Sequence, residues 1–489
     1  MGKKIPLWQT IIVFIVLLVL LYWGIMVDTD AGEGHVVLIF ACGFASLVAI
    51  ANGWKWAYLE QGILAAINRT MQAILILAVV GLMLGSWVSG GVVPSMMYYG
   101  IKIISPKIFL FTTCLLCSIV SLATGSSWST AGSMGAALMG VGIALGFSPA
   151  MTAGAVVSGS YFGDKMSPMS DTTNLAPGVA GSNIFDHIRH MVYTVTPSYI
   201  IALVVFFILG RGAAPNGEIQ MEMKDVLQEA IRNEFVVSPL LILPVILLLV
   251  AVILKVPAIP AMFFSVIMGL FCMGVVQHIS FGDFFSIMHY GYESISADIP
   301  LSDDYSVADV VGGGGFDGML WTVSIVLCSM SFAGVLEVTG MLGQLVEAIL
   351  KVAKTNGLLV LATICTCIFV NLLTADQYLA IILPGRMYRQ AFEDRKLKAK
   401  NLSRCLEDSA TLTSPLIPWN VCGATMTGFL GQPTAAYAKY AVLNYVNPIV
   451  SIIYGFTGFT MEKMTDEEYE KLIEMREAEA EAMKKELEA

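Results

Sequence analysis

The segment YFGDKMSPMSDTTN, residues 161–174, places two aspartates, a lysine, four Ser or Thr hydroxyls, an asparagine and a proline between apolar stretches. A charged side chain costs about 2.5–3.5 kcal/mol at the centre of a membrane-spanning helix, so charges found there usually serve a function. If the flanking stretches span a membrane, this segment is where the protein handles an ion.

The rest of the chain has the composition of a multi-span membrane protein. Of its 489 residues, 56% are hydrophobic and 13% are charged, and the mean hydropathy is +0.75. Soluble globular proteins carry about 25% charged residues. Apolar runs, most of them near the roughly 20 residues that a bilayer requires, recur throughout: Leu7–Val27, Val36–Trp54, Met71–Val93, Tyr199–Leu209, Val236–Leu254, Ala258–Val276, Met319–Leu336 and Tyr437–Phe456. The first run is long and precedes an acidic stretch, so we interpret it as a retained span rather than a cleaved signal.

Two parts of the chain match at a constant spacing. Gly90, Thr124 and Gly135 each have an identical residue 250 positions later, at Gly340, Thr374 and Gly385. An earlier pair, Gly43 and Gly269, is 226 positions apart. A constant spacing across three features indicates an internal repeat.

The placement of Lys and Arg indicates that the two copies are inverted. Lys3 and Lys4 place the N-terminus in the cytoplasm, and Lys55–Arg69 is expected to be a cytoplasmic loop. The equivalent loop in the second copy, His278–Gly315, has no Lys or Arg. Leu138–Ala153 also has none, whereas Arg386–Arg404 has seven. Opposite orientation of two repeats is typical of secondary transporters.

Two apolar segments are predicted to be re-entrant hairpins that enter from opposite sides. Phe109–Gly146 is interrupted by TGSSWST at 124–130, and Leu358–Met387 by TADQ at 374–377. Non-helical backbone at membrane depth needs protein or a watery cavity to satisfy it. The alternative is a full crossing with a kink, since Ser and Thr can bond their own helix backbone.

An interrupted span is predicted after each hairpin, at Ala150–Ala180 and at Leu406–Leu430. Ser-Pro recurs at 167–168 and 414–415, and an asparagine follows each, at Asn174 and Asn420. Proline removes a backbone donor and disfavours helix at the preceding residue, so both spans should unwind there. Unwinding frees carbonyl oxygens, which can bind Na⁺ together with hydroxyl and carboxylate oxygens. A carboxylate beside low-dielectric walls holds a proton more readily than in water, so one site can bind either H⁺ or Na⁺.

The candidate residues follow from these clusters. We expect Na⁺ at the Asp164 and Asp171 region, with Lys165 as a counter-charge. The full set expected to bind ions or couple protons is Asp164, Asp171, Ser167, Ser170, Thr172, Thr173, Asn174, Thr124, Ser126, Ser127, Asp376, Asp408 and Asn420. Structural alternatives stand beside these roles. Asp164 can be a fixed partner of Lys165, Asp171 can cap a half-helix, and Glu407 and Asp408 can lie at the cytoplasmic interface.

The predicted architecture is an all-α polytopic membrane protein with inverted-topology repeats, two re-entrant hairpins and two interrupted helices. Residues 1–210 form the first repeat, 211–235 a polar connecting loop, 236–460 the second repeat and 461–489 a charged cytoplasmic tail. The tail carries five Lys or Arg and eleven Asp or Glu and is expected to be a solvated helix with charge pairs. Both termini are expected in the cytoplasm.

Two motifs resemble the NhaC family of bacterial Na⁺/H⁺ antiporters, within the wider ion-transporter superfamily. They are TGSSWSTAG at 124–132 and, more specifically, GDKMSPMSDTTNLA at 163–176. The resemblance implies proton-coupled Na⁺ extrusion across the cytoplasmic membrane, with Li⁺ as a further cation. The superfamily implies an elevator-type displacement of a transport part against a scaffold. The family also contains exchangers of organic acids such as malate and lactate, which keeps that substrate class open.

Three functions compete on the sequence alone. The first is Na⁺/H⁺ antiport, and the second is a Na⁺- and proton-coupled exchange of small organic acids. The third is an intramembrane aspartyl protease, which paired aspartates can serve. Ser160-Tyr161-Phe162 before Asp164 lacks the Gly-x-Gly-Asp pattern of that enzyme, and the repeat favours a transporter over a channel. We therefore expect no enzyme activity, no cofactor and no nucleic-acid partner, and a homodimer stays open.

Overall fold

The protein is a bundle of helices, described here from a computed structural model. The structure describes residues 3–23, 34–103, 105–212, 217–254, 256–296, 299, 306–350 and 353–474. In this part of the chain, β-structure is limited to two isolated bridges, Tyr292 with Gly313 and Leu397 with Lys463. The expected all-α class is therefore confirmed for the described residues. The acidic stretch 28–33 and the tail beyond residue 474 lie outside them.

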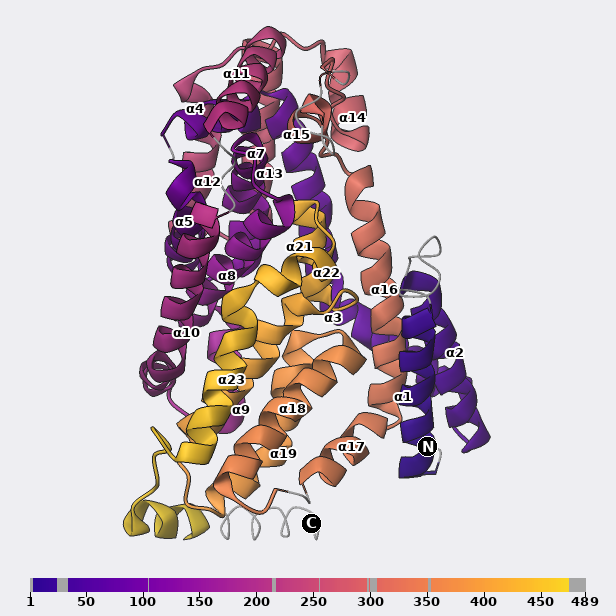
Figure 1. The fold of residues 1–489 in the computed structure, drawn as a ribbon. Coiled ribbons are helices and arrows are strands. Elements are labelled where there is room, and N and C mark those ends of the chain that lie inside the picture. The colour runs from indigo at the N-terminus through magenta and orange to yellow at the C-terminus, as the bar shows by residue number, and fades with distance from the viewer. Residues whose placement is uncertain are drawn as a thin grey trace.

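Helices account for most of the described chain (Figure 1). Seven helical segments in the described ranges are long and apolar enough to span a membrane, and a bent pair at 225–248 would make eight. The helices of the first half are α1 (Leu7–Tyr22), α2 (Gly34–Ala51), α3 (Trp56–Ser89), α4 (Val92–Ile103), α5 (Phe109–Thr124), α6 (Ser127–Thr130), α7 (Ala136–Ala144), α8 (Pro149–Met166), α9 (Asp171–Ala180) and α10 (Ile184–Gly212).

The rest of the described chain begins with the helix that connects the two halves. It contains α11 (Gly217–Glu234), α12 (Leu243–Ile253), α13 (Ala258–Phe271), α14 (Phe281–Tyr290), α15 (Val307–Val311), α16 (Asp317–Val338), α17 (Met341–Leu350), α18 (Asn356–Thr374), α19 (Gln377–Glu393), α20 (Ala399–Leu406), α21 (Val421–Leu430), α22 (Thr434–Tyr437) and α23 (Val442–Thr457). Short π-helical turns follow α6, α13 and α20, at Ala131–Gly135, Cys272–Val276 and Glu407–Thr411.

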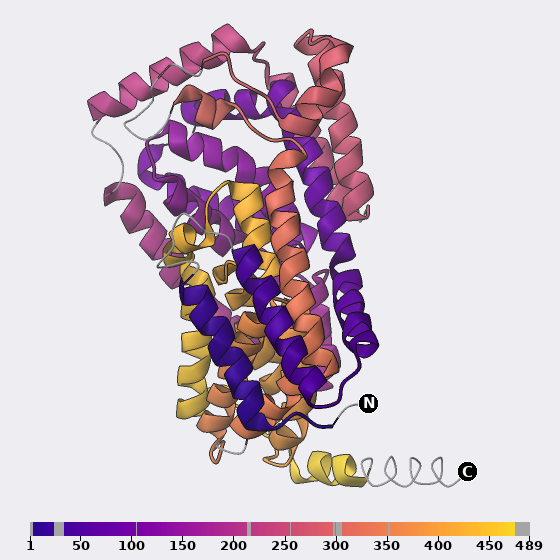
Figure 2. The ribbon, with the colours of Figure 1, turned by 90° about the vertical axis from the view of Figure 1, so that its right-hand side faces the viewer.

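Two expected loops are helical in the structure. Residues 55–69 were predicted to be a basic loop, but α3 begins at Trp56 and runs for 34 residues. The basic residue Arg69 forms an ion pair with Glu337 of α16, so its charge is neutralised inside a helix pair rather than in a loop. The expected polar loop 211–235 contains α11, whose last ten residues make an angle of 90° with the segment Pro239–Leu248. This helix crosses one end of the molecule (Figure 2).

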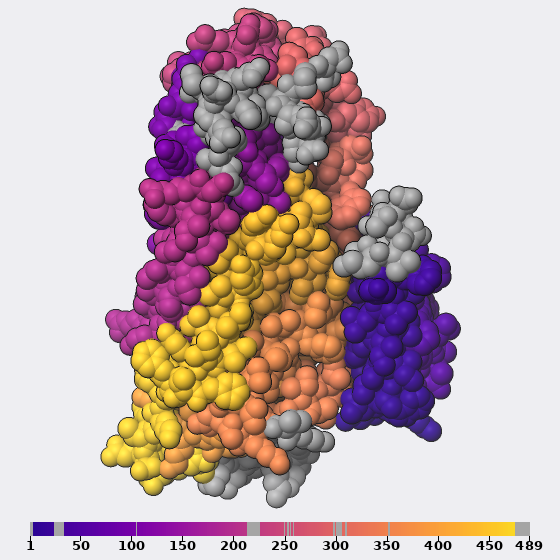
Figure 3. Space-filling model, in the orientation of Figure 1, coloured from indigo at the N-terminus to yellow at the C-terminus, as the bar shows by residue number. Residues whose placement is uncertain are grey.

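Helices α3 and α16 approach each other through two glycines. A Cβ atom on Gly62 would lie 2.8 Å from the carbonyl oxygen of Gly334, and one on Gly334 would lie 2.5 Å from that of Gly62. Small residues allow such backbone contact between membrane helices. The α1–α2 pair packs on α16 at the side of this unit, where it forms the indigo flank in Figure 3. One helix from each half thus takes part in this close contact.

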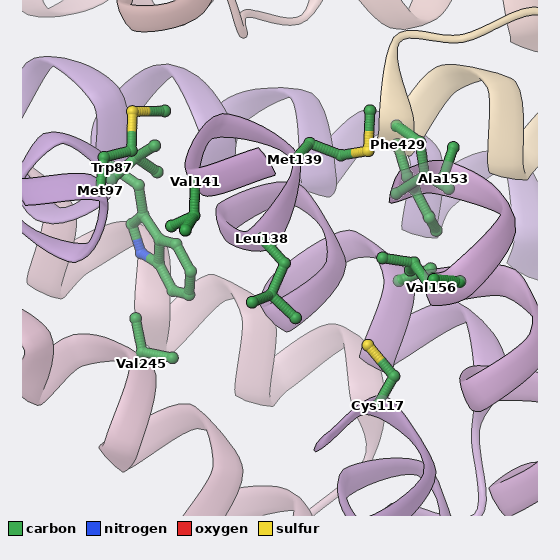
Figure 4. Packing of buried hydrophobic residues seen from close by; sticks show 14 of the residues in the cluster. Trp87, Met97, Cys117, Leu138, Met139, Val141, Ala153, Val156, Val245 and Phe429 are labelled. Carbon is green, nitrogen blue, oxygen red and sulfur yellow. The ribbon is translucent and has the colours of Figure 1, made fainter. Parts of the chain in front are cut away.

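The largest apolar cluster joins elements of both halves. Trp87 of α3, Val141 of α7, Val156 of α8, Val245 of α12 and Phe429 of α21 belong to it, and all are buried (Figure 4). Because these five residues come from five helices of both halves, packing in this cluster fixes the first hairpin against both halves.

The acidic tail contacts the basic loop that precedes α20. Lys396 pairs with Asp466 at 2.7 Å, Lys398 with Glu468 at 3.2 Å, and the Nζ of Lys400 lies 2.5 Å from the carboxylate of Glu462. The hydrogen bond from Lys400 holds the pKa of Glu462 below its ordinary value of 4.5, so this pair is formed at neutral pH and is lost only in acid. The tail acids Glu462, Asp466 and Glu468 thus pair with lysines outside the tail.

Helix α5 packs along α8 through glycines of α8. A Cβ atom on Gly159 would lie 2.2 Å from the carbonyl oxygen of Cys114, and one on Gly163 would lie 2.3 Å from the amide nitrogen of Leu122. Both neighbours are backbone atoms of α5, which cannot move aside without shifting that helix. The first hairpin thus lies against the interrupted span at backbone contact.

We predict that Gly163→Ala separates α5 from α8 and destabilises the protein by about 1–3 kcal/mol, the usual cost of overpacking. The measurement is the melting temperature of the purified protein in detergent. The matched control is Gly43→Ala, since a Cβ atom at that helical position meets nothing within 4 Å. Equal melting temperatures for Gly163→Ala and the unchanged protein would contradict the close contact.

Candidate functional site

The two hairpin segments turn at tips with the same local geometry. Helix α5 ends at Thr124 and is followed by Gly125 with φ 68°. Helix α18 ends at Thr374 and is followed by Ala375 with φ 55°. The next residues, Ser126 and Asp376, are both extended and cap the following helix. Each residue of one tip lies 250 positions before its counterpart, so the spacing seen in the sequence extends to the backbone.

The tips are turns between consecutive helices. Helices α18 and α19 pack against each other after the turn, and α5 likewise contacts α6 and α7. Figure 1 shows α5 and α7 in the upper half of the molecule and α18 and α19 in the lower half. The chain therefore reverses at each polar cluster.

Both predicted interrupted spans are unwound. Helix α8 ends at Met166, and α9 begins at Asp171 with Ser170 as its cap, since the Ser170 hydroxyl accepts from the amide of Thr173. In the second span the break precedes α21, where Asn420 accepts from the amide of Cys422. The capping role considered for Asp171 thus belongs to Ser170.

The structural counterparts differ from the pairing that the sequence suggested. Ser170 and Asn420 occupy the same capping position, 250 residues apart, and the helices that they cap end at the left-handed glycines Gly181 and Gly431. Pro168 therefore corresponds to Pro418, and the Ser-Pro of 414–415 lies earlier in its span. The two Ser-Pro pairs are 247 residues apart (414 − 167), so they do not coincide at a spacing of 250.

Each tip packs on the break of its own half. A Cβ atom on Gly125 would lie 2.8 Å from Met169, and the carbonyl of Ala375 accepts from the amide of Val421 at 2.9 Å. Trp128 beyond the first tip packs on the apolar cluster that contains Ala375 and Val421. The two tips and the two breaks thus gather in one region.

Asp164 lies where the first tip meets the first break. Its side chain is 8% exposed, and its Oδ2 accepts from the Ser127 hydroxyl at 2.6 Å. Asp171 is exposed in the first turn of α9. Asp164, Asp171 and Asp376 all interact electrostatically with the Tyr378 phenol.

Lys165 forms an ion pair with Asp408, and the alternative that it holds Asp164 is wrong. Its Nζ lies 2.6 Å from Asp408 Oδ1, and both side chains are fully buried. The same oxygen accepts from Thr194 at 3.0 Å and from Asn447 at 2.7 Å, while Arg404 lies 3.8 Å from Oδ2. Lys165 is the counter-charge of an acid in the second half of the chain.

Glu407 and Asp408 lie inside the protein rather than on a solvent-exposed surface. Both have 0% exposure and sit in the π-helical turn Glu407–Thr411. Glu407 accepts from the Thr172 hydroxyl at 3.0 Å. Sequence analysis did not include Glu407 in the site. A signal was available in the sequence. Glu407 begins a polar run that ends at Thr411 in the second interrupted span, and the first interrupted span also carries acids.

Most remaining candidates hold the shape of the tips and breaks. The Thr124 hydroxyl lies within hydrogen-bond distance of backbone atoms of its own tip, and the hydroxyls of Ser126 and Ser167 accept from nearby amides. Thr173 donates to the carbonyls of Asp164 and Lys165, and Asn174 donates to those of Pro168 and Ser170. Asp376 accepts from the amide of Tyr378. The hydrogen bonds of these side chains are thus made with backbone atoms.

Comparisons with known proteins agree with this arrangement. A model of the Na⁺/H⁺ antiporter family matches residues 159–459, which contain both breaks and the second tip. The chain is 35% identical over 433 residues to the Na⁺/H⁺ antiporter NhaC of Alkalihalophilus pseudofirmus, covering 88% of this chain and 92% of that protein. It is 35% identical to NhaC of Bacillus subtilis, covering 87% and 92%. It is also 32% identical to the malate-2H⁺/Na⁺-lactate antiporter of Bacillus subtilis, covering 85% and 87%.

We predict that Lys165→Met lowers the free energy of unfolding by about 3–5 kcal/mol, because it leaves the Asp408 carboxylate buried without its cation. The double variant Lys165→Met/Asp408→Asn should lose less than the two single variants together, since no unpaired charge remains. Melting temperatures in detergent measure this cycle.

The control for that cycle is an exposed ion pair. Lys4 lies 3.9 Å from Glu347, and both side chains are more than half exposed. Lys4→Met should change stability by less than about 1 kcal/mol. Strict additivity of Lys165→Met and Asp408→Asn would show that the buried pair is not coupled.

Proposed function

Because the chain belongs to the Na⁺/H⁺ antiporter family, we propose that it exchanges Na⁺ for H⁺ across a membrane. The observation that carries the proposal is the position of Asp164. Its carboxylate is buried at the junction of a hairpin tip and an unwound span, and within the described residues its partner is a hydroxyl, not a Lys or Arg. A buried carboxylate without a fixed cation needs a mobile one, either H⁺ or Na⁺.

Na⁺ is proposed to bind between Asp164 and Asp171. Oxygens available there include the Ser127 and Ser170 hydroxyls and the carbonyls that the break releases from helical hydrogen bonding. Hard cations prefer such oxygen ligands. Na⁺ and a proton each neutralise the same carboxylate, so one excludes the other, and alternate exposure of that site to the two sides gives exchange.

We further propose that residues 1–210 and 236–460 are inverted repeats and that the hairpins and broken helices move together. The shared tip geometry at a spacing of 250 supports the repeat. The backbone contact between α3 and α16 supports a frame against which an elevator-like part moves. The basic loop and the acidic tail then lie on the cytoplasmic side of a bacterial cell membrane, with both termini on that side.

The second candidate function is exchange of organic acids. It is favoured by the similarity to the malate-2H⁺/Na⁺-lactate antiporter, which is nearly as high as that to the two NhaC proteins. The same hairpin tips would form the substrate site, with the hydroxyls of Ser126 and Ser127 donating hydrogen bonds to a carboxylate group of the organic acid. This function requires an organic acid for any Na⁺-dependent proton movement.

We predict that, in proteoliposomes containing the protein, a Na⁺ gradient alone drives protons across the membrane in the direction opposite to Na⁺ movement. A pH-sensitive dye inside the vesicles measures the flux. Asp164→Asn should lower it by at least about tenfold, because an amide neither releases a proton nor carries the charge that binds Na⁺. The same loss is expected for Asp171→Asn.

Asp186→Asn is the matched control, since Asp186 is exposed at the start of α10 and away from the tips. It should leave the flux unchanged. A dye response that appears only after malate or lactate is added would favour the second function. Full Na⁺-dependent flux in both Asp164→Asn and Asp171→Asn would refute the site.

A further inference from the structure

The chain after α23 turns at the lower end of Figure 1 and docks on the loop before α20. The amide of Lys398 donates to the carbonyl of Glu462 at 3.0 Å, and the amide of Met464 donates to the carbonyl of Lys396 at 2.7 Å. Residues 460–464, the docked segment, are therefore held by backbone hydrogen bonds as well as by the ion pairs of the tail acids.

Thr460 of the docked segment binds a buried arginine of α20. The Nη1 of Arg404 donates to the Thr460 hydroxyl at 2.8 Å, and the Arg404 side chain has 0% exposure. The carbonyl oxygen of Thr460 lies 2.8 Å from Nε2 of His190 in α10. Thr460 therefore connects the C-terminal segment to both α10 and α20.

The backbone is strained on both sides of this contact. Thr460 has φ 60° and Lys396 has φ 55°, and they are two of the four non-glycine residues with positive φ in the described chain. This conformation is disfavoured for L residues, and most of all for β-branched ones such as threonine. It persists only where surrounding contacts impose it. The docked state of Thr460 therefore depends on the groups that bind it, Arg404 and His190.

On its other side, Arg404 faces Asp408 without closing on it. The Nε of Arg404 lies 3.8 Å from Oδ2 of Asp408. Both atoms are buried, and neither has a hydrogen-bond partner among the residues that the structure describes. A charge-assisted hydrogen bond between them would be about 2.8 Å long, so a shift of about 1 Å would satisfy both. The hydrogen bond to Thr460 holds the guanidinium back from this position.

The other oxygen of Asp408 holds Lys165. Its Oδ1 accepts from the Nζ of Lys165 at 2.6 Å, and Thr194 and Asn447 also donate to it. A second cation in contact with the same carboxylate would share its single negative charge and weaken its attraction for Lys165. Asp164, which precedes Lys165 in α8, is a buried acid hydrogen-bonded to a hydroxyl. An ammonium group released from Asp408 would therefore have a second carboxylate to neutralise.

We propose that Thr460 is a positioning residue for Na⁺ binding, because it holds Arg404 away from Asp408. Lys165 then stays on Asp408 and leaves Asp164 to Na⁺. This rests on the proposed Na⁺/H⁺ exchange. When the docked segment leaves, Arg404 closes on Oδ2 of Asp408, and Lys165 competes with Na⁺ for Asp164. The C-terminal segment thereby sets the Na⁺ affinity of a site that it does not contact.

The test uses the purified full chain in proteoliposomes and measures Na⁺-driven proton flux at a series of Na⁺ concentrations. Thr460→Val keeps the volume and the β-branch but removes the hydroxyl that accepts from Arg404. We expect its KM for Na⁺ to rise at least about threefold while the maximal rate changes by less than about twofold. Thr460→Ser, which keeps the hydroxyl, should keep the KM of the unchanged protein.

The matched control is Thr457→Val. Thr457 is exposed at the end of α23, and its hydroxyl donates to the carbonyl of Ile453 in the same helix. The control should keep both the KM for Na⁺ and the maximal rate.

A further variant tests the route through Arg404. Lysine at this position keeps the charge but lacks the planar fork that faces both Thr460 and Asp408. In an Arg404→Lys background, Thr460→Val should therefore cause no further change in KM. If Arg404→Lys does not fold, the variants of Thr460 and Thr457 decide the question.

The outcomes separate this inference from the proposed function. If the unchanged protein shows no Na⁺-driven proton flux, the proposed function fails, and the role of Thr460 fails with it. If flux is present and Thr460→Val keeps the KM for Na⁺, only the role of Thr460 is overturned. A lower maximal rate at an unchanged KM would also overturn it, since the segment would then act on movement rather than on Na⁺ binding. An equal rise in KM in Thr457→Val, or a full effect of Thr460→Val in Arg404→Lys, would refute the contact with Arg404 as its cause.

Discussion

The buried ion pair between Lys165 and Asp408 is the interaction on which the site depends. Two buried charges that are not hydrated must be paired with each other. In this pair, Lys165 comes from the first half of the chain and Asp408 from the second. It therefore fixes α8 against the π-helical turn after α20. Because Lys165 pairs with Asp408, the buried acids Asp164 and Glu407 have no fixed positive partner. That distribution of charge, more than any single ligand, makes the centre of the molecule receptive to a mobile cation.

Backbone contact brings the same elements together. Gly163 allows α8 to touch the backbone of α5, and Gly125 allows the first tip to sit on Met169. At the second tip the equivalent position is Ala375, whose left-handed conformation costs a non-glycine residue about 1 kcal/mol or more. The surrounding packing must outweigh this cost. Both tips thus place the N-terminal end of a helix, capped by Ser126 or Asp376, at the centre.

Residue chemistry was sufficient to predict the tips and breaks but not the partners. Thr124, Thr374, Pro168 and the left-handed glycines are local signals, since each acts within a few residues of its own backbone. The pairing of Lys165 with Asp408 joins positions 243 residues apart, and no local rule distinguishes Asp408 from the adjacent Glu407. Likewise, Lys55–Arg69 has the charge of a loop, but it forms the start of α3, and its Arg69 pairs with Glu337 on another helix.

The contact between the tail and the basic loop has a consequence for how the molecule responds to its surroundings. Its three ion pairs are partly exposed, so their attraction is screened over about 8 Å at physiological ionic strength and over shorter distances in stronger brine. The buried pair at the centre is shielded from this effect. The attraction between the tail and the loop therefore weakens as the salt concentration on their side of the membrane rises. This contact makes the conformation of the Na⁺/H⁺ antiporter sensitive to ionic strength.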